Sequence, residues 1–298
     1  MHPLRLLLDH SIDYAGLFPP AALAMRPALE NYARYRSGPD AWALGRFVVP
    51  AGRLDELESA SSGLLPPGSE EPWRLSVLIG PDPAADLRRL EDLNCRHAGA
   101  GAGALVADVV ELKAETADAV EAALARLPRH LAAFVELPLA RDPGPALAAI
   151  ARHGAGAKVR TGGVTEDAFP ATDDLLRFLR AAVRAGVPFK ATAGLHHPLR
   201  ARYRLTYEPD SASGTMFGFL NLFLAAAFLR QGMSDADAGH LLEEGDPASI
   251  AFDRQGVSWR GHRLEAAALE EARRGGLGSF GSCSFEEPIG DLASLHLL

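Results

Sequence analysis

Short apolar segments that alternate with longer helical patterns are the feature that most constrains the fold of this 298-residue chain. Seven segments read as strands, and their starts lie about 25–40 residues apart, the length of one strand-plus-helix unit. Several are apolar on both faces, as expected of strands in a covered parallel sheet. The seven segments are Leu6–Asp9, Leu44–Val49, Arg74–Ile79, Ala104–Glu111, Leu131–Leu137, Ala157–Arg160 and Phe189–Ala191.

The stretches between these segments carry the end signals of α-helices. Thr116 is a good N-cap for a helix over Thr116–Leu127. Gly186 follows another helical pattern at the position of a C-cap glycine. Together with an eighth strand at Ser279–Ser284, these units predict a single (β/α)8 barrel over residues 1–298. The long stretch Leu195–His262 is predicted to be an inserted helical and hairpin segment between units seven and eight, over or beside the C-terminal face.

Composition excludes several classes of function. The chain has 30 Lys and Arg against 38 Asp and Glu, and this net charge of −8 gives no general footprint for nucleic acid or anionic lipid. Its longest apolar run, near Phe217–Leu229, is too short to cross a bilayer, and the N-terminal residues lack the pattern of a signal peptide. Two cysteines exclude a disulfide scaffold and a multi-cysteine zinc site. We expect a cytoplasmic protein with a small-molecule substrate and no nucleic-acid or membrane partner, and leave a homo-oligomer open.

Two lysines lie within short apolar strands that are neighbours in the predicted barrel, where chemistry belongs to the C-terminal strand ends. Period-2 alternation places Lys158 and Arg160 on one face of their strand, and Lys190 and Thr192 on one face of the next. An amine in apolar surroundings beside a second cation has a lowered pKa, and as a neutral nucleophile it forms a Schiff base with a carbonyl. Asp108, on the fourth strand, is predicted to face the two lysines across the lumen and to relay protons.

These segments, taken in order, resemble the deoxyribose-phosphate aldolase type of class I aldolase barrel. Gly-Ala-Lys158-Val-Arg-Thr-Gly162 resembles its Schiff-base strand, and Phe-Lys190-Ala-Thr-Ala-Gly194 resembles its second lysine strand. Phe-Gly281-Ser-Cys-Ser284 resembles its terminal phosphate turn. Shorter matches are Leu-Leu-Asp9-His10-Ser, Arg-Phe-Val-Val-Pro50, Ala-Asp108-Val-Val and Phe-Val-Glu136.

The resemblance implies a role for each matching residue. Lys158 forms the imine, Lys190 lowers the pKa of Lys158, Asp108 relays protons through water, and Asp9 is a supporting acid on the first strand. The predicted substrate pocket contains Glu136, Arg160, Gly162, Gly163, Gly194, His196, His197, Ser282 and Ser284. The glycines and serines of this set are expected to form an anion nest.

The chain departs from the family pattern where a substrate would bind. Arg160 stands where the family has a small residue, and His196-His197-Pro198 replaces a short Gly-Gly turn. The two histidines are expected to hydrogen-bond the substrate or to act as general acid or base. Cys283 is expected to be a buried, inert thiol. We therefore predict a divergent relative: an aldolase-like carbon–carbon lyase that acts on a small oxo compound or sugar without a metal or organic cofactor.

Two other classes of function stay open. A metal-dependent hydrolase or lyase would draw its ligands from His10, Asp9, Asp108, Glu136, His196 and His197, although no His-x-His or His-Glu-x-x-His spacing is present. A non-catalytic binding barrel is the other alternative, because a lysine in a strand is often a snorkelling or salt-bridged residue.

Overall fold

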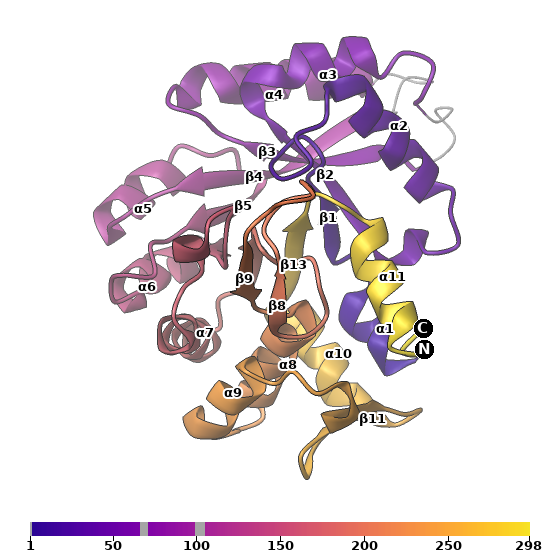
Figure 1. The fold of residues 1–298 in the computed structure, drawn as a ribbon. Helices are drawn as coiled ribbons and strands as arrows, with labels where there is room; N and C mark the ends of the chain where they lie inside the picture. The colour runs from indigo at the N-terminus through magenta and orange to yellow at the C-terminus, as the bar shows by residue number, and fades with distance from the viewer. Residues whose placement is uncertain (1, 66–70, 99–104) are drawn as a thin grey trace.

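A closed barrel of parallel strands forms the centre of the molecule, and helices surround it (Figure 1). The computed structural model describes residues 2–65, 71–98 and 105–298, so Ala104 of the fourth predicted strand lies outside the described residues. The strands close in the order β1-β13-β7-β6-β5-β4-β3-β2, which confirms the (β/α)8 barrel. The barrel strands are β1 (Ile12–Tyr14), β2 (Leu44–Pro50), β3 (Trp73–Leu78), β4 (Leu105–Lys113), β5 (Ala132–Glu136), β6 (Gly156–Arg160), β7 (Phe189–Thr192) and β13 (Leu277–Ser282).

Helices lie between and after these strands, and two of their ends have the terminal residues that the sequence predicts. The Thr116 side chain accepts a hydrogen bond from the Ala119 backbone N–H at 3.2 Å and caps α5. Gly186 ends α7 with a left-handed φ of +64°, a conformation that strains any residue with a Cβ. These helices are α2 (Met25–Arg36), α3 (Leu54–Ala60), α4 (Pro83–His97), α5 (Ala117–Leu124), α6 (Gly144–Arg152), α7 (Thr172–Ala185) and α11 (Glu286–Ser294).

The first predicted strand, Leu6–Asp9, is wrong, because this apolar run belongs to helix α1 (Pro3–Leu8). Pro3 lies in the first helical turn, where its missing N–H costs no hydrogen bond. Leu4, Leu7 and Leu8 are fully buried, and their spacing of three and four residues forms one apolar helix face. The first barrel strand is instead β1, which places Asp13 rather than Asp9 among the strand residues.

The segment between β7 and β13 holds both a barrel helix and additional elements. The ring of Phe223, in α8, lies 6.3 Å from that of Phe189 in β7 and 5.8 Å from that of Phe280 in β13, so α8 packs directly on the barrel. Only parts of the predicted insertion 195–262 are therefore additions to the barrel. The elements in order are the hairpin β8 (Ala201–Arg204) and β9 (Ser213–Met216), helices α8 (Phe219–Arg230) and α9 (Asp235–Leu242), the sheet β10 (Ile250–Phe252), β11 (Gly256–Trp259) and β12 (His262–Glu265), and α10 (Ala266–Gly275).

Helix α8 is the most apolar helix of the fold, and ten of its residues are buried. Its one buried amide, Asn221, donates hydrogen bonds to the carbonyls of Leu241 and Glu244 at 2.8 and 2.9 Å. None of the helices in the described ranges is long and apolar enough to cross a bilayer.

Candidate active site

Five charged side chains meet inside the barrel, and we call them the lysine–carboxylate cluster. Its members are Asp13 of β1, Glu111 of β4, Glu136 of β5, Lys158 of β6 and Lys190 of β7. Lys158 and Lys190 lie on adjacent strands, as predicted, and the structure makes them register partners. Charges are retained in a barrel interior only when they are paired, so the three carboxylates and two amines are expected to depend on one another.

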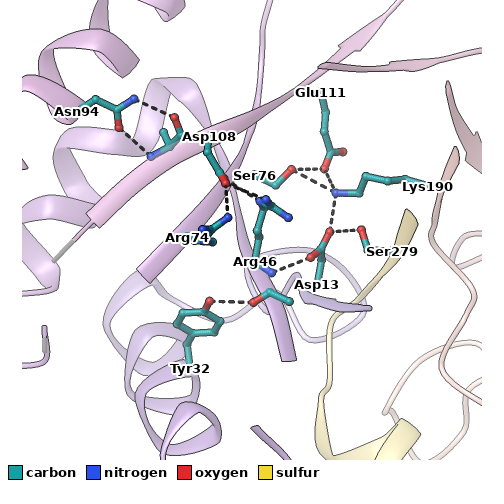
Figure 2. Close-up of polar contacts among 12 residues, drawn as sticks. Asp13, Tyr32, Arg46, Arg74, Ser76, Asn94, Asp108, Glu111, Lys190 and Ser279 are labelled. Atoms are coloured by element: carbon teal, nitrogen blue, oxygen red, sulfur yellow. Dashed lines mark hydrogen bonds and ion pairs between the residues drawn. The ribbon is translucent and has the colours of Figure 1, made fainter. Parts of the chain in front are cut away.

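The Lys190 ammonium has a partner for each of its N–H groups (Figure 2). Nζ donates to Oε1 of Glu111 at 2.6 Å and to Oγ of Ser76 at 3.2 Å, and lies 2.6 Å from Oδ2 of Asp13. Burial alone would lower the pKa of Lys190, but the charges of Asp13 and Glu111 outweigh it and raise that pKa. Lys190 is therefore a fixed cation with no N–H left for a ligand.

Asp13 is held in place from both sides of its carboxylate. The Ser279 hydroxyl donates to Oδ2 at 2.6 Å, and the backbone N–H of Arg46 donates to Oδ1 at 2.7 Å. The adjacent Gly45 must lack a side chain, because a Cβ there would lie 2.3 Å from Oδ1. The position of Asp13, and with it that of Lys190, is thus set by the backbone of β2 as well as by β1.

Lys158 differs from Lys190 because, among the described residues, its ammonium pairs with two groups rather than three. Its Nζ lies 2.8 Å from Oε2 of Glu111 and 2.8 Å from Oε2 of Glu136, so Glu111 bridges the two lysines. Burial raises the pKa of Glu111, but Lys190 and Lys158 outweigh burial and hold that pKa well below its usual range. Oε2 of Glu136 is buried, and no donor in the described part of the chain is aligned to hydrogen-bond it.

A cavity of about 420 Å³ opens in front of Lys158. The terminal residues of four neighbouring strands line it, which places it at the C-terminal mouth of the barrel: Lys113, Glu136, Arg160 and Thr192. The sequence contains only three lysines among its 30 basic residues, and all three line this cavity. Lys113, the third, is at the rim, with 75% of its side chain exposed and its Nζ 3.8 Å from Glu136.

A second pocket, of about 250 Å³, adjoins the cavity and lies beneath the loop of the β8–β9 hairpin. His196 and Gly163 line both spaces, whereas Tyr203 and Tyr207 belong to the hairpin side. Arg160, whose guanidinium lies 3.5 Å from Glu136 and is half exposed, lines the main cavity. Two cations, Arg160 and Lys113, therefore stand at the entrance to Lys158.

The neighbouring histidines have separate partners. Nδ1 of His196 lies 3.0 Å from Oε2 of Glu287 and 3.4 Å from the Ser282 hydroxyl. Nδ1 of His197 lies 2.6 Å from Oδ2 of Asp291, and its ring stacks on Tyr203 with centroids 3.5 Å apart. Burial lowers the pKa of His196, but hydrogen bonds to Cys283 and Glu287 reverse this and raise the pKa to about 9. The buried Cys283 thus lies beside His196, with Sγ 4.0 Å from Nδ1.

The glycines predicted to form an anion nest serve the packing of the mouth. A Cβ at Gly162 or Gly194 would lie 2.4 or 2.7 Å from the Phe169 ring, and one at Gly163 would lie 2.7 Å from Cβ of Ala168. Ser284 lies two residues before α11, and its hydroxyl accepts a hydrogen bond from the Glu287 backbone N–H in the first turn at 3.1 Å. Anion binding at these residues stays a prediction.

Two predicted acids lie apart from the cluster. The carboxylate of Asp108 accepts two hydrogen bonds from the Arg46 guanidinium, at 2.7 and 2.8 Å, and one from Arg74 at 3.0 Å (Figure 2). The pairing of β3 with β4 skips Asp108, and this irregularity turns the residue out of the regular alternation. Asp9 ends α1, and its contribution is a backbone carbonyl that accepts from Arg273 at 2.6 Å. Glu111 and Asp13 take the places expected for these two acids.

Comparison with known proteins does not assign this chain to a family. No protein-family model matches the sequence, and no curated protein matches it significantly. The described residues contain no group of three or more His, Cys, Asp or Glu side chains that could hold a metal ion. The ligands that the metal-dependent alternative requires are dispersed; Nδ1 of His10, for example, pairs with the Leu44 carbonyl at 2.9 Å. The aldolase resemblance stays a prediction, and the function must be argued from the site.

Proposed function

We propose that the protein is a carbon–carbon lyase of the aldolase type, which binds a small oxo compound as a Schiff base on Lys158. One observation carries the proposal: both buried amines line the cavity and contact carboxylates, but Lys158 pairs with only two groups in the described part of the chain, so one of its N–H groups is left for a ligand. Lys190 has every N–H engaged and serves the site as a fixed charge. Buried lysines in mixed polar and apolar surroundings are the usual source of imine-forming nucleophiles.

The amine attacks a carbonyl only as the free base, so Lys158 must first lose a proton. Glu136 is the acceptor best placed for it, because Oε2 is 2.8 Å from Nζ of Lys158 and Glu136 lines the same cavity. The nitrogen then bonds to the carbonyl carbon, and loss of water from the carbinolamine leaves a positively charged iminium. That charge accepts the electron pair of the bond between the α and β carbons as this bond breaks, which leaves an enamine on Lys158 and, once the β-hydroxyl loses its proton, a free carbonyl product.

Glu111 stabilises the iminium charge. Its carboxylate is held ionised by Lys190, and Oε2 stays beside the Lys158 nitrogen throughout. The proposed role of Lys190 is thus to keep Glu111 ionised and to hold Glu111 and Asp13 in position. This differs from the role that the family resemblance implies, in which Lys190 lowers the pKa of Lys158.

The proposal is tested by trapping the imine. The protein is incubated with acetaldehyde, pyruvate or glyceraldehyde, reduced with borohydride, and mapped by peptide mass spectrometry. Because the chain has three lysines, the adduct can be assigned without ambiguity. We expect it on Lys158, and expect Lys158→Met to abolish it.

Lys113→Met is the matched control, since Lys113 lines the same cavity but is mostly exposed. This variant should retain the adduct on Lys158. The absence of an adduct with every compound, or an adduct confined to Lys113, refutes the proposed function.

A further inference from the structure

We propose that His196 is the group that moves protons to and from the imine-bound substrate, and that Glu287 positions it. This inference rests on the proposed function, because it concerns the fate of a substrate already bound to Lys158. His196 follows β7, and its ring lines the wall between the Lys158 cavity and the pocket under the hairpin. It is therefore adjacent to the space that a substrate on Lys158 would fill.

The imidazole is anchored through one nitrogen and free at the other. Nδ1 has Glu287 Oε2 at 3.0 Å and the Ser282 hydroxyl at 3.4 Å, whereas Nε2 has no hydrogen bond to a residue in the described ranges. The ring is only 7% exposed, so its orientation is set by packing as well as by Nδ1. A histidine with a carboxylate on one nitrogen and a ligand space beside it is the usual arrangement of a general acid–base.

The groups around Glu287 keep its carboxylate directed at His196. The Tyr207 hydroxyl, from the hairpin loop, donates to Glu287 Oε2 at 3.2 Å and lies 3.4 Å from Sγ of Cys283. Burial raises the pKa of Tyr207, so the phenol remains a donor. A further titratable neighbour of Glu287 is His197, whose Nε2 is 3.9 Å from Oε1 of Glu287. These contacts favour a positive charge on His196, whose pKa is raised to about 9.

A protonated His196 begins the sequence as an acid. It donates its proton to the carbinolamine oxygen, which leaves as water, so that the iminium forms and His196 becomes neutral. Neutral His196 then takes a proton from the carbon next to the imine, or from the substrate hydroxyl when the carbon–carbon bond breaks. The electron pair moves to the iminium nitrogen and gives an enamine. His196 returns the proton to the enamine carbon, and hydrolysis releases the product.

The test separates proton transfer from imine formation. The probe is acetaldehyde or pyruvate in D₂O, whichever gives the borohydride adduct on Lys158. Exchange of its α-hydrogens for deuterium is followed by NMR, while adduct yield at long incubation is measured in parallel. We expect His196→Gln to keep the adduct and to slow exchange by about 10²–10⁴-fold, the usual contribution of a general acid–base.

Two carboxylates of α11 provide a matched pair, because each contacts the Nδ1 of one histidine. Glu287→Gln should slow exchange and move the alkaline limb of its pH profile to lower pH, whereas Asp291→Asn should leave both as in the wild type. Wild-type exchange in His196→Gln, or an unmoved profile in Glu287→Gln, overturns this inference and leaves the imine intact. A wild-type protein without a Lys158 adduct overturns the proposed function and the inference together.

Discussion

Replacement of Lys190 by methionine tests whether the lysine–carboxylate cluster is held together by its charges. Methionine is an unbranched side chain of similar length, so the substitution removes charge with little change in packing. Asp13 and Glu111 would each lose a contact of 2.6 Å to Nζ and would remain inside the barrel. Removing one partner of a buried ion pair costs about 3–5 kcal/mol of unfolding free energy, because the other charge is left uncompensated.

The unfolding free energy lost in Lys190→Met should decrease as the pH falls. In the wild type the pKa of Glu111 is lowered, so its contribution to stability is present above the pKa of an unfolded carboxyl and is lost as pH falls. In Lys190→Met, Glu111 loses that support, its pKa rises, and its protonation relieves the unpaired charge. The difference in unfolding free energy between wild type and variant should therefore be smaller at pH 5 than at pH 8.

Urea unfolding followed by circular dichroism at both pH values measures this difference. Lys113→Met is the control, because its side chain is 75% exposed and its removal should change the unfolding free energy by no more than about 0.5 kcal/mol. The prediction is refuted if the unfolding free energy of Lys190→Met at pH 8 lies within about 1 kcal/mol of the wild-type value, because a broken buried pair should cost more. It also fails if the penalty is equal at the two pH values.

Three further predictions concern other parts of the chain. The pKa of His196 is raised from 6.5 to about 9, so the protonation of His196 stabilises the fold fully below pH 6.5, and this contribution is lost as the pH rises through 9. The difference in unfolding free energy between wild type and Glu287→Gln, measured by urea unfolding, should therefore shrink as the pH rises from 6.5 to 9. Asp108→Asn should lower the unfolding free energy by about 1–3 kcal/mol, since Arg46 loses its bidentate partner, while the borohydride adduct is unchanged. Gly186→Ala should cost about 1 kcal/mol because φ is +64°, whereas Gly290→Ala, within α11 and facing open space, should gain about 0.5–1 kcal/mol; thermal melts compare the two.

The barrel was predictable because several independent signals agree. Strands that are apolar on both faces, the regular distance between them and residues such as Thr116 and Gly186 at helix ends all indicate the same repeating unit. The common pocket of Lys158 and Lys190 was also predictable, because alternation fixes the face of each residue and the two strands are neighbours in the barrel. Their direct register pairing is added by the structure.

The error at the first strand has a physical origin that a short segment cannot reveal. A run such as Leu6–Leu8 fits a buried strand or the apolar face of a helix equally well, and only packing decides between them. Here Leu4, Leu7 and Leu8 form a helix face, and the strand begins four residues after the run. This misplacement is why Asp9 was expected where Asp13 lies.

Glu111, rather than the predicted Asp108, contacts the lysines because the pairing of β4 with β3 is irregular. Ala107 pairs with Leu75 and Val109 with Ser76, so one residue of β4 is skipped between them. Such bulges leave no dependable sign in a single sequence, and alternation counted across one is out of step. Glu136 was predicted as a pocket residue, but the ion pairs of the lysines with Glu111 and Asp13 were not predicted, since they depend on the three-dimensional positions of β4 and β1. The aldolase family, the substrate and a cytoplasmic location remain predictions.

The scarcity of lysine has a practical consequence for anyone who handles this protein. Reagents that acylate amines, and surfaces activated to couple them, will find lysine side chains only at the entrance and floor of one cavity. Attachment through Lys113 would seal that entrance, whereas the arginine-rich exterior would stay untouched. Labelling for binding studies is therefore better directed at Cys95, which is the exposed thiol of the pair and lies on α4.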